Sequence, residues 1–279
     1  MPQDDVVRAS ARAWEIDRYL SALLSPRSVR QDLINLAAFA GEIARIPAFV
    51  SEPMMGEIRL QWWREALENA DLRIRSGHPV ADAVREIAGR WELPLGLLMG
   101  FIDAQTTKLH DEPITDDQAL TAHLAKTEGA LFELALRITG RRDEVAQAAA
   151  LAAGQAYGLA RLLVELPALW AQGNVLIPVT RLSAAGLTLA QVQAGVAPDR
   201  IAPVLAGLAA EALRHLAEAR RLSARMSRAQ RDALLPLAVV EPYLRAFERG
   251  RRDPLREPLD IAPLSRVWAL WLSHLRGRF

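Results

Sequence analysis

The sequence predicts an all-α fold, in a single domain that spans residues 1–279. Apolar residues recur at helical spacing along almost the whole chain, and no run of alternating β-branched residues is typical of a strand. Proline and glycine separate the periodic segments, but no linker between them is long enough to divide two domains. Hydrophobic residues make up 51% of the chain, which is enough to bury a substantial core.

The helical pattern defines a series of segments, most of which end near a proline or a glycine. Ser51 is expected to cap the third of them, and Pro53 is tolerated in its first turn. The predicted helices cover, in chain order, residues 4–24, 28–46, 53–75, 79–91, 94–109, 116–139, 143–170, 199–225, 228–248 and 262–276.

The predicted helix over 53–75 carries an arginine, Arg59, near the middle of its apolar face. Three interpretations of Arg59 stay open. It packs against Trp62 and Trp63 as a cation–π contact, it pairs with a buried acid such as Asp103 or Glu165, or it binds an anion. The apolar face itself comprises Ile58, Leu60, Trp62, Trp63, Ala66 and Leu67.

Composition excludes several functional classes. A net charge of +1 gives no electrostatic basis for binding nucleic acid. The chain has no cysteine, its histidines are scattered, and no phosphate-loop or zinc motif occurs, so no cofactor is expected. The first residues lack the pattern of a signal peptide, and polar residues interrupt the longest apolar stretch, 145–170. We therefore expect a cytoplasmic protein.

Several segments together resemble the squalene/phytoene synthase family. They are "YLSALLSPRSVRQDLINLAAFAGEIARI" (19–46), the stripe of Leu60, Trp63 and Leu67, "LPLGLLMGFIDAQTTKL" (93–109) and "GQAYGLARLLVELPALWAQGNVLIPVTRL" (154–182). The resemblance runs in order over roughly residues 19–270. It implies the isoprenoid-synthase helical bundle, whose helices surround a central apolar cavity.

The departures from the family pattern bear on activity. Family enzymes condense two prenyl diphosphates, and two aspartate clusters hold Mg²⁺ ions that bridge carboxylates to the diphosphates. An ungapped comparison places few acids at these positions, so a three-magnesium cluster is hard to build. The first cluster falls on Ala44, Arg45 and Ala48, the second on Glu165 and Leu169, and Lys108 replaces the acid that closes the "ID" segment.

Two interpretations of these positions remain open. In the first, cations replace the metal and bind an isoprenoid diphosphate or other anionic lipid directly. The ligand-binding candidates are then Tyr19, Arg45, Arg59, Lys108 and Arg161. In the second, an active Mg²⁺-dependent prenyl transferase survives. Its residual metal ligands are Glu42, Asp103 and Glu165. Arg161 and Glu165 also have the spacing of a simple pair within one helix.

Within the family, residues 38–67 and 262–279 look most similar to a divergent branch, the complex I assembly factors and their bacterial relatives. Members of this branch are thought to have lost synthase activity. The resemblance implies a protein that aids assembly of a respiratory complex, peripheral at the inner membrane. Alternatively, side chains fill the cavity of a scaffold. The last helix, with Val267, Leu270, Trp271 and Leu275 along one stripe, either closes the core or contacts a membrane or partner.

Overall fold

The structure is a computed structural model that describes residues 3–69, 71, 73–171, 175–194, 198–249 and 261–279. Every regular element in these ranges is helical, which confirms the all-α prediction. Buried apolar side chains from these helices form one contiguous hydrophobic core. None of the described helices is long and apolar enough to cross a membrane.

The helices fall into three consecutive parts of the chain. The first part contains α1 (Gln3–Trp14), α2 (Ile16–Leu24), α3 (Arg27–Ala44), η1 (Pro47–Phe49), α4 (Pro53–Glu68), α5 (Pro79–Trp91), α6 (Leu95–Asp103) and α7 (Thr106–Leu109). The middle contains α8 (Asp117–Leu124), η2 (Ala125–Gly129), α9 (Ala130–Ile138), α10 (Glu144–Ala171), α11 (Val179–Ala184) and α12 (Leu189–Gln193). The last part contains α13 (Pro198–Ser223), α14 (Arg228–Ala233), η3 (Leu235–Val239), α15 (Val240–Arg249) and α16 (Pro263–Arg276).

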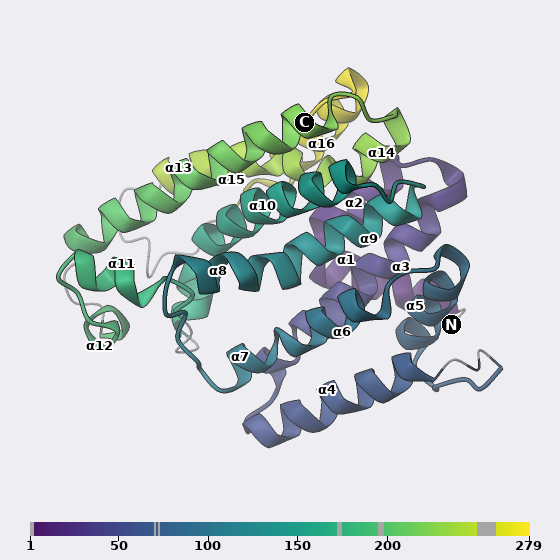
Figure 1. Cartoon of the computed structure of the whole chain (residues 1–279), viewed down its shortest axis with the longest axis horizontal. Helices are drawn as coiled ribbons and strands as arrows, with labels where there is room; N and C mark the ends of the chain where they lie inside the picture. Colours follow the sequence, from purple (N-terminus) through teal and green to yellow (C-terminus); the bar gives the residue numbers. More distant parts are fainter. Residues whose placement is uncertain (1–2, 70, 72, 172–174, 195–197, 250–260) are drawn as a thin grey trace.

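The bundle is organised around α10, the helix with the most buried surroundings. Helix α10 packs along α13 on one side and against η2 and α9 on the other (Figure 1). Small residues dominate its buried face, including Ala149, Ala153, Ala156 and Ala160, so neighbouring backbones can approach closely. Below α9 in the figure, α6 and then α4 complete the layers, while α1, α2 and α3 pack behind them.

Several predicted helices are interrupted. The prediction of one helix over 4–24 is wrong because the chain bends at Glu15, whose φ of −135° and ψ of 56° are not helical. Residues 94–109 divide into α6 and α7, residues 228–248 divide at η3, and a π-helical segment, η2, interrupts 116–139. Helices α11 and α12 were not predicted, because their short runs carry little periodicity.

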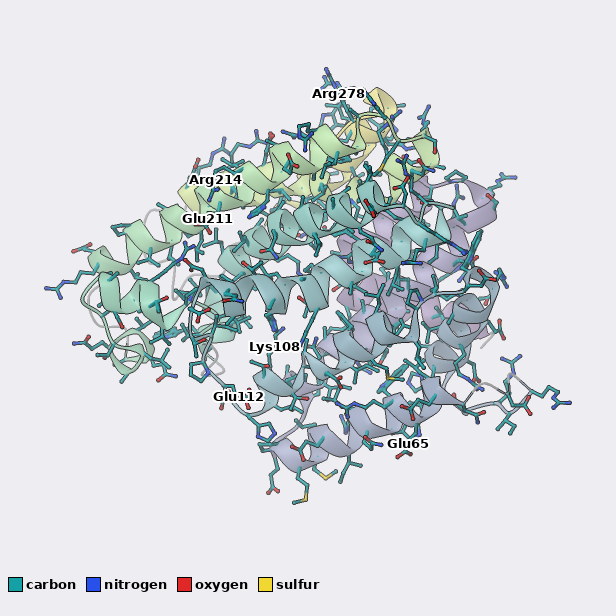
Figure 2. All side chains as sticks on the ribbon, viewed as in Figure 1. Glu65, Lys108, Glu112, Glu211, Arg214 and Arg278 are labelled. Carbon is teal, nitrogen blue, oxygen red and sulfur yellow. The ribbon has the colours of Figure 1, made fainter. Side chains whose placement is uncertain are left out.

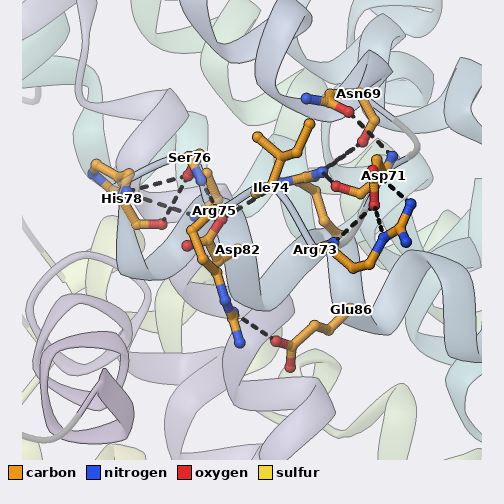
Figure 3. A network of polar contacts seen from close by, with 11 residues as sticks. Asn69, Asp71, Arg73, Ile74, Arg75, Ser76, His78, Asp82 and Glu86 are labelled. Carbon is orange, nitrogen blue, oxygen red and sulfur yellow. Dashed lines mark hydrogen bonds and ion pairs between the residues drawn. The ribbon is translucent and has the colours of Figure 1, made fainter.

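The predicted helix over 53–75 ends early, at Glu68. The buried guanidinium of Arg85 in α5 donates to the carbonyl oxygens of Asn69 and Ile74, at 2.7 and 2.8 Å, and so holds the chain in a loop. Around it, Arg75 pairs with Glu86 at 2.8 Å, and the other contacts of this loop are drawn in Figure 3. Non-local hydrogen bonds therefore override the helical pattern of these residues.

Helix α4 buries a narrower face than the sequence predicts. Its buried side chains lie on the stripe of Leu60, Trp63 and Leu67, whereas Ile58 and Trp62 are 57% and 37% exposed. Arg59 is exposed beside them and not inserted in the core. The first turn begins at Pro53 after Glu52, and Ser51 does not cap it.

This geometry gives a test within one helix. Trp63→Ala should lower the free energy of unfolding by about 3–5 kcal/mol, because it removes a ring packed against Phe39 and His78. The adjacent Trp62→Ala is the matched control and should change it by less than about 1.5 kcal/mol, since that ring is partly exposed. Urea denaturation of the two variants measures both values. Equal losses would mean that α4 faces the core differently.

Candidate functional site

A small polar cavity lies inside the bundle, where the start of α2, α6, α7, η2 and α10 meet. Its volume is about 60 Å³, which is room for a few waters. Both charged and apolar side chains surround it. The lining comprises Glu15, Ala44, Phe101, Gln105, Lys108, His123, Leu124, Thr127, Glu128, Leu131, Gly158, Arg161, Leu162, Glu165, Leu169 and Leu176.

Two arginines and two glutamates form a buried ring of ion pairs beside this cavity. Arg161 donates to Glu15 at 2.8 Å and to Glu128 at 3.2 Å. Arg18 reaches the other oxygens of the same acids, Glu128 at 2.5 Å and Glu15 at 3.3 Å. We call Glu15, Arg18, Glu128 and Arg161 the ion ring. Each charge in it faces two opposite charges, so the ring as a whole is neutral.

The local sequence explains why these charges point inward. Glu15 and Arg18 continue the buried stripe of Val7, Ala11 and Ala22, at helical spacings of three and four residues. The bend at Glu15 lets the stripe turn into the interior with α2. A charge on such a stripe must find a partner inside the bundle, because water cannot reach it there.

Glycines bring Glu128 against α10. A Cβ atom on Gly154 would lie 2.4 Å from the backbone nitrogen of Gly129, and one on Gly158 would lie 2.6 Å from Leu124. Only glycine therefore permits this close approach of η2 to α10. The π-helical turn of η2 carries Glu128 at that crossing, where its carboxylate accepts a hydrogen bond from Arg161 of α10 at 3.2 Å.

Burial and charge shift the pKa values of the ring in opposite directions. Burial raises the pKa of Glu15, and the nearby carboxylate of Glu128 adds to that shift against the pull of Arg161. Burial also acts on Glu128, but the guanidinium groups of Arg161 and Arg18 outweigh it and lower the pKa. Both arginines have raised pKa values, because their acids oppose the desolvation that would lower them. Glu128, Arg18 and Arg161 are thus shifted toward their charged forms, whereas Glu15 is shifted toward its neutral form.

Lys108 and Gln105 face the cavity without a matching partner. The Lys108 ammonium is half-buried and makes no hydrogen bond or ion pair among the described residues, and Figure 2 shows it between α4 and α8. Burial and the positive charge of Arg161 lower its pKa. Gln105 is buried, and its Oε1 accepts no hydrogen bond. These two groups are where a polar ligand or water would gain most.

A second polar cluster continues the interior beyond the ion ring. Asp17 accepts hydrogen bonds from the hydroxyls of Tyr157, at 2.9 Å, and Tyr243, and it pairs with Arg266 at 2.7 Å. Arg18 also lies over the ring of Phe132, 4.5 Å from its centroid. A continuous column of polar side chains therefore joins α2, α10, α15 and α16 through the centre of the bundle.

The structure brings together some of the residues predicted from the sequence. Lys108, Arg161 and Glu165 share the cavity, and Arg161 also pairs with Glu165 at 3.0 Å, as its spacing within the helix indicated. Tyr19 is half-buried against the core and does not line the cavity. Of the predicted residues, Lys108, Arg161 and Glu165 therefore lie together in the cavity.

The other predicted residues lie elsewhere. Arg45, Arg59 and Glu42 line a separate surface pocket of about 530 Å³ with Trp62, and Arg45 pairs with Glu42 at 2.5 Å. Arg45 therefore lies apart from Lys108 and Arg161, which line the interior cavity. Asp103 is exposed at the end of α6 and pairs with Arg64 at 2.8 Å, so Arg59 does not take it as a partner.

The sequence and the fold both match a known protein family. Residues 12–268 match the squalene/phytoene synthase family, which is most of the chain. The chain belongs to this family. Two solved structures share the fold. Squalene synthase HpnC from Alicyclobacillus acidocaldarius has a TM-score of 0.76 and 21% identity, over 88% of this chain and 93% of that chain. A dehydrosqualene synthase in complex with ligand has a TM-score of 0.82 and 13% identity, over 99% of this chain and 97% of that chain.

Two relatives of known name are complex I assembly factors, not synthases. The assembly factor 6 of NADH dehydrogenase (ubiquinone) complex I from Rattus norvegicus is 26% identical over 96% of this chain and 80% of its own length. The Homo sapiens protein of the same name is 26% identical over 93% of this chain and 79% of its own. The resemblance that the sequence showed to both the family and this branch is confirmed.

The acids of this family member do not fit a magnesium–diphosphate site. Glu15, Glu128 and Glu165 all accept hydrogen bonds or ion pairs from Arg161, so one guanidinium already pairs with all three carboxylates. The three acids predicted for the alternative interpretation, Glu42, Asp103 and Glu165, lie in three different places. Over the residues that the structure describes, no group of three or more acidic, histidine or cysteine side chains is placed to hold a metal.

The ion ring was not predicted from the sequence, apart from Arg161. Two of its four pairs join residues separated by 110 and 146 positions, and no local spacing encodes those two contacts. The one available signal was positional. Glu15, Arg18 and Glu128 stand where the surrounding pattern calls for apolar residues, as Leu124 and Leu131 do on either side of Glu128.

We expect His123, beside the cavity, to make the stability of the protein depend on pH. Burial, reinforced by the charge of Lys108, lowers its pKa to about 4. A histidine in the unfolded chain binds a proton near pH 6.5, so the unfolded state gains protons first as the pH falls. Between pH 7 and 5 this histidine alone should remove about 2 kcal/mol of stability. Urea denaturation of His123→Asn at pH 8, 7 and 5 should show that much less acid sensitivity than wild type. Parallel curves would place the wild-type imidazole in water.

Proposed function

We propose that this protein is a non-catalytic member of the squalene/phytoene synthase family that aids assembly of a respiratory complex. One observation supports the loss of catalysis: the ion ring occupies the interior, and Arg161 pairs with each acid beside it. The proposal extends the names of the relatives, complex I assembly factors, to this chain.

The physical argument against catalysis has two parts. Prenyl diphosphate condensation needs carboxylates that are free to bind Mg²⁺, because the metal stabilises the leaving diphosphate. In this protein Glu15 and Glu128 are held by arginines, and exchanging a buried guanidinium for a hydrated metal would leave Arg18 and Arg161 unpaired. The space is also too small. A cavity of about 60 Å³ falls well below the roughly 300–1,000 Å³ of typical ligand sites.

A non-catalytic role makes a specific genetic prediction. Deleting the gene in its own host should reduce assembled NADH dehydrogenase, and wild type supplied in trans should restore it. The double variant Asp103→Asn, Glu165→Gln should restore it equally, because both side chains are substantially exposed and, under this proposal, neither binds a metal. Native gels stained for NADH dehydrogenase activity measure the outcome.

The same variant separates a catalytic from a non-catalytic role. An enzyme that depends on these residual acids would lose rescue in the double variant while its abundance stayed normal. Purified wild type, supplied with farnesyl or geranylgeranyl diphosphate and Mg²⁺, should release no pyrophosphate. Multiple turnover in that assay would establish the prenyl transferase and overturn the non-catalytic proposal. Undiminished NADH dehydrogenase after deletion would overturn the assembly role.

A second function, metal-free binding of an anionic prenyl lipid, is favoured by Lys108. Lys108 lines both the interior cavity and an adjoining surface pocket of about 320 Å³, and among the described residues its ammonium makes no hydrogen bond or ion pair. The buried, unsatisfied Oε1 of Gln105 lies on the same cavity. A diphosphate at Lys108 needs no bridging metal, because an ammonium binds phosphate directly.

The two lysines of the sequence make a matched pair of variants. In EDTA, farnesyl diphosphate should bind wild type and Lys126→Met alike, because Lys126 is exposed on η2 and does not line the cavity. Lys108→Met should weaken binding at least ten-fold, as expected for loss of a charged hydrogen bond worth about 1.5–3 kcal/mol. Isothermal titration measures the affinities. Equal binding by both variants, or binding only with Mg²⁺, would overturn the role of Lys108. Arg161 serves less well as a probe because its removal breaks the ion ring.

A further inference from the structure

The last helix, α16, exposes a continuous apolar face. Only Leu270 of this helix is buried, so the helix contributes that residue to the core while Val267, Trp271 and Leu275 of the predicted stripe are exposed. The exposed residues recur at spacings of three and four, as on one face of a helix. They are Leu264, Val267, Trp268, Trp271 and Leu275, between 41% and 82% exposed. The rings of Trp268 and Trp271 lie together, with centroids 5.1 Å apart.

A basic pocket adjoins this face. It has a volume of about 680 Å³, and Ala269, Leu272 and Arg276 supply its α16 side, next to the apolar stripe on the helix. Five arginines but a single acidic side chain, Glu241, contribute to its lining. The arginines are Arg220, Arg231, Arg245, Arg276 and Arg278.

Most of this positive charge is unneutralised. Arg220 pairs with Glu241 at 2.8 Å, which uses the one acid. Within the part of the chain that the structure describes, the guanidinium groups of Arg245, Arg276 and Arg278 make no hydrogen bond or ion pair. Arg231 is held by the carbonyl oxygen of Met226, but its buried Nε has no acceptor. The pocket therefore offers donors to several anionic oxygens.

Tryptophan, leucine and arginine gathered at one end of the molecule match the chemistry of a bilayer surface. Indole rings favour the boundary between headgroups and acyl chains, and arginines beside them attract anionic lipids. Arg278 stands at the outer end of α16, at the top of Figure 2. A second copy of this chain fits less well, because a two-fold contact through this face would bring unpaired arginines against each other.

We propose that α16 and the arginine pocket dock this protein on the surface of an anionic lipid bilayer. The apolar face enters the headgroup boundary, and the pocket binds the phosphates of anionic headgroups. This contact is peripheral and lies apart from the interior cavity. It adds a surface to the proposed assembly role but does not rest on it, so the two can fail separately.

Vesicle co-sedimentation tests the proposal with the full chain. Wild type should bind vesicles of phosphatidylcholine with 30 mol% phosphatidylglycerol, bind pure phosphatidylcholine weakly, and lose affinity as salt rises. Trp268→Ala with Trp271→Ala should reduce partitioning at least ten-fold. Arg276→Gln and Arg278→Gln should each reduce binding to the anionic vesicles about five-fold, from the usual contribution of one basic residue near such a surface.

Two matched variants control for generic effects of charge and aromatic loss. Trp62→Ala removes a partly exposed tryptophan on α4, and Arg214→Gln removes an arginine on α13 whose side chain is 70% exposed. Both should bind as wild type does, and all variants should stay folded in the assay because the altered side chains are at least partly exposed. Equal losses in the control variants, or no binding to anionic vesicles, would overturn the proposal. So would a dimer in sedimentation velocity that Trp268→Ala dissociates, since that would assign the face to a second copy.

Discussion

A charge taken out of water has to be paired, and the interior of this protein depends on that constraint. The carboxylates of Glu15 and Glu128 alternate with the guanidinium groups of Arg18 and Arg161, and each is stable there only because the others are present. The ring forms because three features bring its members within ion-pair distance: the bend before α2, the π-helical turn of η2 and the glycines of α10. Removing one member would leave its neighbours charged and buried, which typically destabilises a protein by about 3–5 kcal/mol.

The helical bundle is common to the squalene and dehydrosqualene synthases of similar structure. The interior of this protein differs from a metal site, because the arginines of the ion ring already neutralise its glutamates. With the interior closed by side chains, the exposed apolar residues gather on the outside, chiefly Met54, Met55 and Ile58 of α4 and the Trp268 face of α16. The surface, more than the cavity, therefore presents the groups with which this chain can bind other molecules.

Local sequence determined the helices well and the interior poorly, for physical reasons. Periodicity identified α3, α5, α10 and α16 because each buries a regular stripe, and the Arg161–Glu165 pair followed from spacing alone. The end of α4 was misjudged because the carbonyls beyond it bond to Arg85, which lies in the next helix. Glu15 and Arg18 were missed for a similar reason: their partners on η2 and α10, Glu128 and Arg161, stand more than a hundred residues away. Whether Arg59 lies in the core or in solvent depends on the rotation of α4, which Trp63 sets through contacts with Phe39.

The ion ring has a consequence for how the chain reaches this structure. Its four members come from α2, η2 and α10, so the first two are synthesised long before their partners. Until α10 emerges, a collapsed N-terminal half would bury Glu15 and Arg18 without their remaining counter-charges, and that state is disfavoured. Closing the loop between residue 15 and residue 161 also carries an entropic penalty that must be met before the contacts form. Compaction of the N-terminal half is therefore disfavoured until α10 is synthesised, and the two halves of the bundle fold cooperatively.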